Sequence, residues 1–127
     1  MRNTDGSPTV LLIEDDVLVG MDLSETLAAA GYRVIGPVTQ ISDALAALRE
    51  AMPAAAVVDV RLKDGSCAAL APELRQRRIP YLVHTGCRRD DPLAAAFLDA
   101  PWFAKPAAFR DLIAALDDLA RECGSAS

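Results

Sequence analysis

Two kinds of hydrophobic pattern alternate along the chain. Short runs of aliphatic residues, bounded by turn residues, are followed by longer segments in which hydrophobic positions recur every three or four residues. The short runs are typical of strands and the longer segments of helices. We therefore expect a β-α unit repeated along the chain, with strands at Val10–Ile13, Arg33–Ile35, Ala56–Val60, Tyr81–His84 and Trp102–Ala104.

The helical segments differ in how clearly they are marked. They are expected at Val17–Ala30, Ser42–Ala51, Cys67–Arg77, weakly at Pro92–Ala100, and at Phe109–Arg121. Gly31 is placed as a C-terminal cap and Ser42 as an N-cap. Pro72 falls inside the third pattern and predicts a disturbed helix, because proline removes one backbone hydrogen bond. The stretch from Gly86 to Pro101 is short and interrupted by prolines, so the pattern leaves open whether a full fourth helix forms.

The first, third and fourth strands are almost continuously apolar, which is typical of strands covered by helices on both faces. Alternating β-α units with right-handed connections predict an α/β fold, a doubly wound five-stranded parallel sheet of flavodoxin-like order 2-1-3-4-5. We expect one folded domain over residues 9–123, with disordered tails at 1–8 and 124–127. In this architecture, binding sites lie beyond the carboxyl ends of the strands.

Composition narrows the possible functions. The chain has 18 acidic and 13 basic residues, a net charge of -5. That sign argues against direct binding of nucleic acid. Three cysteines at Cys67, Cys87 and Cys123, with a single histidine, are too few for a structural zinc site and fit a reducing cytoplasm. No segment has the pattern of a signal peptide or of a membrane span, so we expect a soluble cytoplasmic protein without membrane association.

Charged and polar residues stand at the ends of four predicted strands. These are Glu14, Asp15 and Asp16 after the first, Asp59 at the third, Thr85 at the fourth and Lys105, followed by Pro106, at the fifth. Neighbouring strand ends meet at one edge of a parallel sheet, so these residues are expected to form one group.

Carboxylates gathered in this way need a neutralising partner. Two of them about 4 Å apart repel by roughly 4 kcal/mol at an effective dielectric of about 20. Mg²⁺ characteristically binds one or two carboxylates and shares its coordination shell with a phosphoryl group. An aspartate beside Mg²⁺ and a lysine is a plausible nucleophile towards phosphorus, and a nearby hydroxyl such as that of Thr85 can hydrogen-bond the transferred group.

Four fragments together resemble the receiver domains of response regulators in bacterial two-component systems. The resemblance is to response regulators of the single-domain type. The fragments are Leu-Leu-Ile-Glu-Asp-Asp, Val-Val-Asp-Val-Arg-Leu-Lys-Asp-Gly, His-Thr-Gly and Ala-Lys-Pro, each at a strand end and in the family's order. The resemblance extends from Thr9 to about Cys123. It implies a phosphorelay switch that receives a phosphoryl group from a sensor histidine kinase or a histidine phosphotransfer protein, with Mg²⁺ as cofactor, and signals by binding a downstream protein.

The resemblance assigns a role to individual residues. Asp59 matches the phosphoacceptor, and Thr85 and Lys105 match the switch hydroxyl and the lysine that assist it. The metal ligands would be Glu14, Asp15, Asp59 and the backbone carbonyl of Arg61. Trp102 matches the aromatic switch position three residues before the lysine, where Tyr or Phe is commoner. Such a domain is a phosphoacceptor rather than an enzyme, although it assists its own phosphorylation and dephosphorylation.

Simpler interpretations of several of these residues are also possible. The acidic run at Glu14 could be solvated charge at a helix N-terminus, whereas Asp59 inside an apolar run would be costly to leave unpaired. His84 should point away from Thr85 by strand alternation, into a helix-covered or partly exposed position. Two other functions stay open: an aspartyl-phosphate-type phosphatase, which would normally need an acid where Arg61 stands, and a pseudo-receiver that binds partners without phosphorylation.

Overall fold

The computed structural model describes residues 7–62 and 64–125 and contains the expected parallel sheet. Its order is β2-β1-β3-β6-β7, and every neighbouring pair is parallel. The strands are β1 (Thr9–Ile13), β2 (Arg33–Val38), β3 (Ala55–Val58), β6 (Tyr81–Thr85) and β7 (Trp102–Ala104). Counted along the chain within this sheet, they give the predicted order 2-1-3-4-5.

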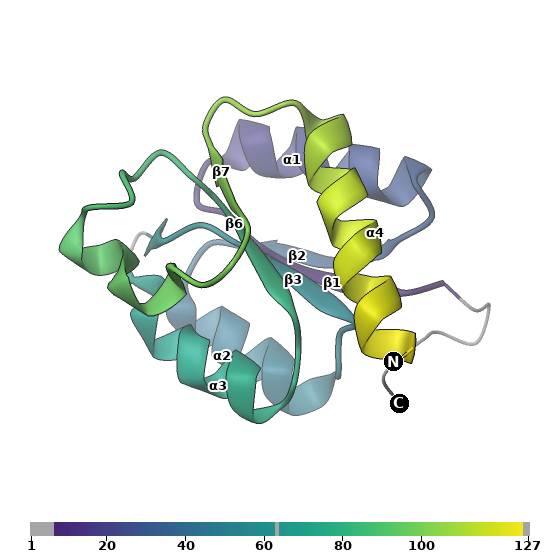
Figure 1. Ribbon diagram of the computed structural model, residues 1–127, viewed down its shortest axis with the longest axis horizontal. Helices are drawn as coiled ribbons and strands as arrows, with labels where there is room; N and C mark the ends of the chain where they lie inside the picture. Colours follow the sequence, from purple (N-terminus) through teal and green to yellow (C-terminus); the bar gives the residue numbers. More distant parts are fainter. Residues whose placement is uncertain (1–6, 63, 126–127) are drawn as a thin grey trace.

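Helices cover both faces of the sheet (Figure 1). On one face lie α1 (Val17–Ala29) and α4 (Phe109–Ser125), and on the other lie α2 (Ile41–Glu50) and α3 (Leu70–Gln76). Alternate residues of each central strand face the two layers. In β1, for example, Val10 and Leu12 pack with α1 and α4, whereas Leu11 and Ile13 pack with α2 and α3. Burial on both faces explains why β1, β3 and β6 are apolar throughout.

The caps of the first two helices differ in how well local sequence predicts them. Asp16 is the N-cap of α1, and its side chain accepts from the backbone N–H groups of two residues in the first turn. Gly31 follows the C-cap with φ of +100°, as expected for the end of α1. The prediction that Ser42 caps α2 was wrong, because the helix already begins at Ile41. The N–H of Ile41 instead donates to both carboxylate oxygens of Asp64, which comes from a distant loop.

The third and fourth helical segments are short. A 3₁₀ turn at Cys67–Ala69 leads into α3, and Pro72 lies in the first turn of that helix, where no intrahelical N–H bond is lost. The segment Pro92–Phe97 is a 3₁₀ helix, so within the described residues no full α-helix forms there. Two further strands, β4 (Arg61–Leu62) and β5 (Gly65–Ser66), form a small antiparallel hairpin that the sequence pattern does not reveal.

The edge strand β2 runs three residues beyond its predicted end. It thereby reaches the edge of the sheet where the carboxyl ends of the strands lie. Its pairing with β1 shifts register between Leu11 and Ile13, opposite Gly36. Gly36 has φ of +119°, and a Cβ there would lie 2.5 Å from the carbonyl oxygen of Leu12. The continuation brings the carbonyl of Val38 to the N–H of Glu14, at 2.9 Å. Gly36 thus allows the close strand contact that fixes the backbone of Glu14.

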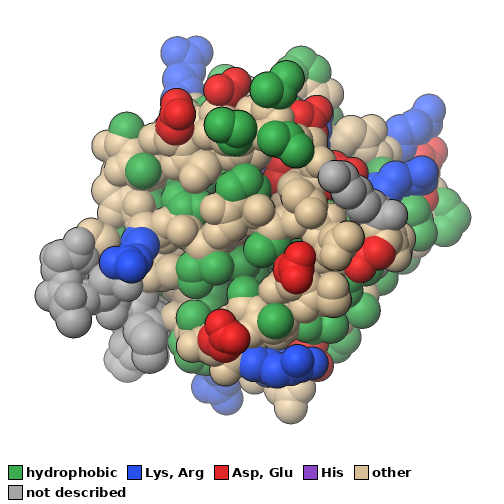
Figure 2. All heavy atoms as spheres, turned by 180° about the vertical axis from the view of Figure 1, so that it is seen from behind, with side chains coloured by type: hydrophobic (Ala, Val, Ile, Leu, Met, Phe, Trp, Pro, Cys, Tyr) green, Lys and Arg blue, Asp and Glu red, His purple; other side chains and the backbone are tan. Residues whose placement is uncertain are grey.

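Most large hydrophobic side chains are buried, and the exposed ones gather mainly on one element. Val17, Leu18 and Met21 are more than half exposed in the first turns of α1, and the view from behind shows hydrophobic side chains at the surface in this upper region (Figure 2). Within residues 7–62 and 64–125, no helix is long and apolar enough to cross a membrane. The predicted tails fall largely outside the described residues, although α4 continues to Ser125.

Candidate functional site

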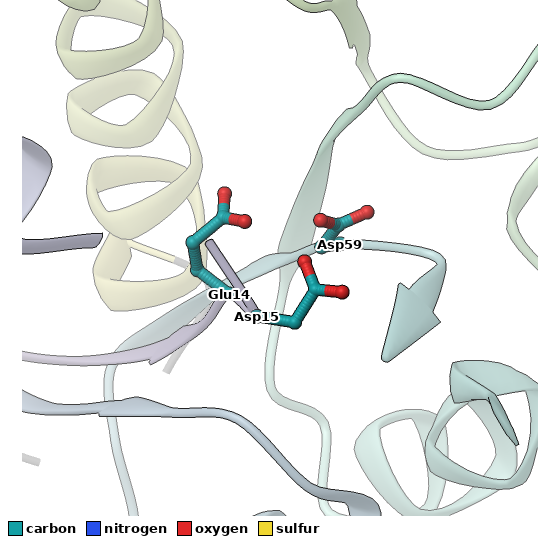
Figure 3. A group of neighbouring side chains, drawn as sticks. All are labelled: Glu14, Asp15 and Asp59. Atoms are coloured by element: carbon teal, nitrogen blue, oxygen red, sulfur yellow. The ribbon is translucent and has the colours of Figure 1, made fainter. Parts of the chain in front are cut away.

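Four strand ends deliver charged and polar side chains to one edge of the sheet. Glu14 and Asp15 follow β1, Asp59 follows β3, Thr85 ends β6 and Lys105 follows β7. One oxygen from each of Glu14, Asp15 and Asp59 lies within 4.8 Å of the others. In Figure 3 the carboxylates of Asp15 and Asp59 lie side by side, and that of Glu14 is set apart from this pair. The structure therefore brings the predicted group together.

Asp59 is 4% exposed, and both of its carboxylate oxygens accept hydrogen bonds. The hydroxyl of Thr85 donates to Oδ1 at 2.6 Å, and the ammonium of Lys105 donates to Oδ2 at 2.9 Å. The backbone N–H of Arg61 adds a longer bond of 3.4 Å to Oδ1. A buried carboxylate held by a hydroxyl and an ammonium is a partnered charge, which explains how it is tolerated at the end of an apolar strand.

Lys105 connects two of the acids. Besides its contact with Asp59, its Nζ lies 2.7 Å from Oε2 of Glu14, which also accepts from the backbone N–H of Asp16 at 3.0 Å. Glu14 is almost completely buried, at 1% exposure, so this pairing with Lys105 compensates a charge that water cannot reach. The peptide between Lys105 and Pro106 is cis.

The crowding of acids shifts the pKa of several groups. Burial is the main cause that raises the pKa of Glu14 to about 7, against the opposing effect of Lys105. Burial and then the charge of Asp59 also raise the pKa of Asp15. For Lys105, burial alone would lower the pKa, but its hydrogen bonds to Glu14 and Asp59 outweigh burial and raise it. Lys105 is therefore fully charged at neutral pH. Glu14, with a pKa of about 7, is only partly charged at the same pH.

An open cleft of about 480 Å³ lies over this group. Asp15, Asp59, Thr85 and Lys105 line it, and Glu14 does not. Hard divalent cations bind oxygen ligands, and Mg²⁺ usually keeps several water molecules. Asp15 and Asp59, with adjacent carboxylates that face the cleft, fit such an ion as direct ligands. Glu14, which already binds Lys105, fits the second layer around it better.

The segment after β6 shapes the other side of the cleft. The hydroxyl oxygen of Thr85 accepts from the backbone N–H of Cys87 at 3.2 Å while its hydrogen points to Asp59. Cys87 and its neighbour Arg88 both line the cleft, although the sequence pattern gave neither a role. Their position two and three residues after a strand-end threonine was the available signal.

Arg61 and Trp102 lie at the margins of this arrangement. The side chain of Arg61 lines the cleft, is 63% exposed and lies 3.8 Å from a carboxylate oxygen of Asp91. Trp102 is half-buried and packs against the core on the α2 and α3 side, with the guanidinium of Arg89 5.2 Å from the centre of its ring. The proposed metal contact of the Arg61 carbonyl and the switching of Trp102 stay predictions.

His84 and the described cysteines are not among the side chains that hold Asp59. His84 is 2% exposed and packs edge-to-face against Phe109 of α4, so it occupies the helix-covered position. Cys67 is buried and Cys87 half-buried, and both are free thiols. The side chain of Cys123 lies outside the described residues.

No protein-family model matches the sequence. A curated relative is the transcriptional regulatory protein PdtaR of Mycobacterium tuberculosis, which is 30% identical over 112 residues. The match includes 85% of this chain and 54% of that protein, so the chain spans about half the length of the curated relative.

Solved structures of receiver domains superpose on nearly the whole chain. The non-phosphorylated HemR receiver domain of Leptospira biflexa is 28% identical, with a TM-score of 0.75, and the match covers 90% of this chain and 94% of that one. A response regulator receiver protein from Sinorhizobium medicae has a TM-score of 0.84 at 22% identity, covering 94% and 99% of the two chains.

The two structural matches cover almost the full length of domains described as receivers, and the curated relative is itself a regulator. The sheet order and helical layers described above are those of this flavodoxin-like fold. The chain therefore has the fold of the receiver domains of response regulators and resembles them over nearly its whole length.

Proposed function

We propose that this domain accepts a phosphoryl group on Asp59, with Mg²⁺ as cofactor, and signals by binding another protein. The observation that carries the proposal is the double contact of one buried carboxylate: Thr85 holds Oδ1 and Lys105 holds Oδ2 of Asp59. A hydroxyl and an ammonium at these positions can both bind the oxygens of a group attached to that carboxylate.

The proposed donor is the phosphohistidine of a sensor histidine kinase or of a histidine phosphotransfer protein. A carboxylate oxygen of Asp59 attacks phosphorus, one P–O bond forms, and the P–N bond of the donor breaks with its electron pair left on the imidazole. Lys105 offsets the negative charge that spreads over the transferring group. Later attack by water on phosphorus releases inorganic phosphate and restores Asp59.

Asp15 and Asp59 would hold the magnesium ion, with Glu14 acting through Lys105 and the backbone carbonyl of Arg61 as a further ligand. When bound, Mg²⁺ supplies positive charge that stabilises the phosphoryl oxygens during transfer. The chain's own contribution is to hold the acceptor carboxylate in place through Thr85 and to keep the ammonium group of Lys105 beside it.

We propose that phosphorylation changes the surface of the domain that binds the downstream protein. Thr85 and Trp102 are the proposed switch residues, because Thr85 touches the acceptor and Trp102 lies on the neighbouring strand β7. New bonds from Thr85 to a phosphoryl group would favour one of two packings of the segment after β6 and of β7. We also propose a cytoplasmic location, with which the free thiols of Cys67 and Cys87 agree, and no direct binding of nucleic acid or membrane.

Intact mass after incubation with acetyl phosphate and Mg²⁺ tests the proposal. The wild-type chain should gain one phosphoryl group, and Asp59→Asn should gain none. Asp64→Asn is a matched control, because Asp64 is an exposed acid five residues away that binds Ile41 rather than the cleft. Equal labelling of the wild type and Asp59→Asn would contradict the proposal.

The two other functions predict different results in the same samples. A phosphatase would turn over small phosphate esters many times per chain, and the exposed Arg61 where a general acid would be needed gives no support for it. A pseudo-receiver would remain unlabelled at all donor concentrations. The retained contacts of Thr85 and Lys105 with Asp59 speak against that outcome.

A further inference from the structure

His84 is a buried polar side chain that the proposed phosphoryl transfer does not use. It is 2% exposed, and neither of its ring nitrogens has a hydrogen-bond partner among the described residues. Buried polar groups are usually hydrogen-bonded, so an unpartnered one calls for an explanation. His84 is adjacent to Thr85 in β6, but it faces the layer of α1 and α4, where it packs against Phe109.

The imidazole of His84 lies close to the carboxylate of Glu14. Nδ1 of His84 lies 4.0 Å from Oε1 of Glu14. The two hydrogen bonds that Glu14 accepts among the described residues, from Lys105 and from the N–H of Asp16, both end on Oε2. Oε1 is thus the Glu14 oxygen that lies near His84. Figure 3 shows the Glu14 carboxylate apart from the adjacent carboxylates of Asp15 and Asp59.

The contact has a preferred chemical form. Burial, and then the charge of Lys105, lowers the pKa of His84, which favours a neutral ring with a single N–H. Two lone pairs facing each other across 4.0 Å would repel, so the hydrogen belongs on Nδ1, where it points to an acceptor. A shift of about 1 Å would turn this contact into a hydrogen bond of ordinary length.

Lys105 is shared between two acids, and this makes a second donor to Glu14 useful. A phosphoryl group on Asp59 would add charge and three acceptor oxygens beside Lys105. Lys105 would then turn towards the new oxygens and weaken its bond to the 1% exposed Glu14. Without a replacement, a buried carboxylate would lose its strongest partner.

We propose that His84 is a positioning residue, whose Nδ1–H binds Oε1 of Glu14 and holds that side chain in place when Lys105 binds the phosphoryl group. This inference rests on the proposed phosphorylation of Asp59. It explains why a histidine occupies an apolar layer and gives Glu14 a defined position in both states of the domain.

Nitrogen NMR of the full chain tests the resting contact directly. His84 is the only histidine in the sequence, so the ring signals need no assignment. At pH 8 we expect a neutral ring with its hydrogen on Nδ1, the nitrogen that lies near Oε1 of Glu14. Addition of acetyl phosphate and Mg²⁺ should move the Nδ1 proton signal downfield. A ring with its hydrogen on Nε2, or a signal unchanged in a chain shown by mass to be labelled, would overturn the proposal.

Paired substitutions test the positioning role through the rate of labelling. His84→Asn keeps an N–H donor at the place of Nδ1, whereas His84→Leu has similar bulk and no donor. We expect His84→Leu to label roughly tenfold more slowly and His84→Asn to stay within about threefold of the wild type. Phe109→Leu, which removes the packed ring but no donor, should label like the wild type.

Equal rates in the Asn and Leu variants, or a Phe109→Leu variant as slow as His84→Leu, would assign the effect to packing and overturn the proposal. If His84→Leu fails to fold, the Asn variant and the NMR measurement still decide. Absence of labelling in the wild type would instead overturn the proposed function, while the nitrogen signals would still show whether His84 donates to Glu14.

Discussion

The hydroxyl of Thr85 is bonded on both sides, since it donates to Oδ1 of Asp59 at 2.6 Å and accepts from the N–H of Cys87 at 3.2 Å. The Cys87 contact occupies one lone pair of the oxygen, while its hydrogen is directed to the carboxylate. Thr85 and Asp59 are both at most 4% exposed, so this bond forms away from water. Thr85 therefore faces Asp59 directly.

Thr85→Val should destabilise the fold and slow the labelling of Asp59. Valine has the same shape as threonine but leaves Oδ1 of Asp59 without its shortest hydrogen bond, a loss of about 1–3 kcal/mol in the free energy of unfolding. Urea denaturation measures the change in stability, and intact mass measures the labelling rate. Thr85→Ser retains the hydroxyl and should recover most of both quantities. A valine variant as stable as the wild type would mean that the bond contributes nothing to folding.

Stability should depend on pH through Glu14. Its pKa is raised to about 7 in the folded chain from an ordinary value of 4.5, so the folded state binds more protons than the unfolded state between these values. Stability therefore falls as the pH rises from about 4.5 to 7, by on the order of 3 kcal/mol, and this cost is absent below pH 4.5.

The comparison of wild type with Glu14→Gln isolates this contribution, because glutamine does not titrate. The difference in free energy of unfolding between the two chains should change in favour of the variant as the pH rises through this window. Glu25→Gln, the same change at an exposed position of α1, is the control for the loss of one acid. Parallel curves for the wild type and Glu14→Gln would show that Glu14 titrates normally.

Magnesium should stabilise the fold at pH 8 much more than at pH 5. An ion that binds only the folded chain adds about 2.7 kcal/mol at a concentration 100 times its Kd. The raised pKa of Asp15 means that protons compete with the ion for this ligand at low pH, and protonation of Glu14 also removes negative charge near the site. Thermal unfolding with and without a chelator measures the effect. Asp15→Asn should abolish the response, whereas Asp22→Asn, the same change at an exposed position of α1, should preserve it.

The fold was predictable because its main features depend on local patterns of hydrophobic and turn residues. Continuous apolar runs marked the central strands, and Gly31 marked the end of α1. Features that depend on distant residues were not accessible. Ser42 has the right chemistry for a cap, but Asp64 from a separate loop takes that role at Ile41. A two-residue strand such as that at Arg61–Leu62 is too short to leave a periodic pattern.

The candidate site was predictable as a set of residues but not as a network. The rule that strand ends meet at one edge was sufficient to group Asp15, Asp59 and Lys105. It could not show that Lys105 divides its bonds between two acids, or that Glu14 lies outside the cleft, because side-chain directions after a strand end depend on packing. The same limit applies to His84, whose orientation was predicted but whose contact with Glu14 was not.

Gly36→Ala should be far more harmful than Gly31→Ala, although both glycines have positive φ. At Gly31 the added Cβ meets nothing within 4 Å, so only backbone strain of about 1–2 kcal/mol is expected. At Gly36 the Cβ would lie 2.5 Å from the carbonyl oxygen of Leu12, in the strand that leads to Glu14. We expect a loss of roughly 3–5 kcal/mol there, measured by urea denaturation. Equal losses would indicate that β2 moves aside freely.

Arg89 should restrain Trp102, the only tryptophan, and limit its response to phosphorylation. The guanidinium lies 5.2 Å from the centre of the ring and also donates to the carbonyl of Leu98 at 3.0 Å, so it ties β7 to the segment before it. Arg89→Gln should cost about 0.5–1 kcal/mol and enlarge the change in Trp102 fluorescence when acetyl phosphate and Mg²⁺ are added. Arg121→Gln is the matched control, because Arg121 is an exposed residue of α4 paired with Asp118 and should leave that change as it is in the wild type. Identical fluorescence responses in both variants would show that Arg89 does not hold the indole, and the mobility of Trp102 would then have to be set by its core contacts alone.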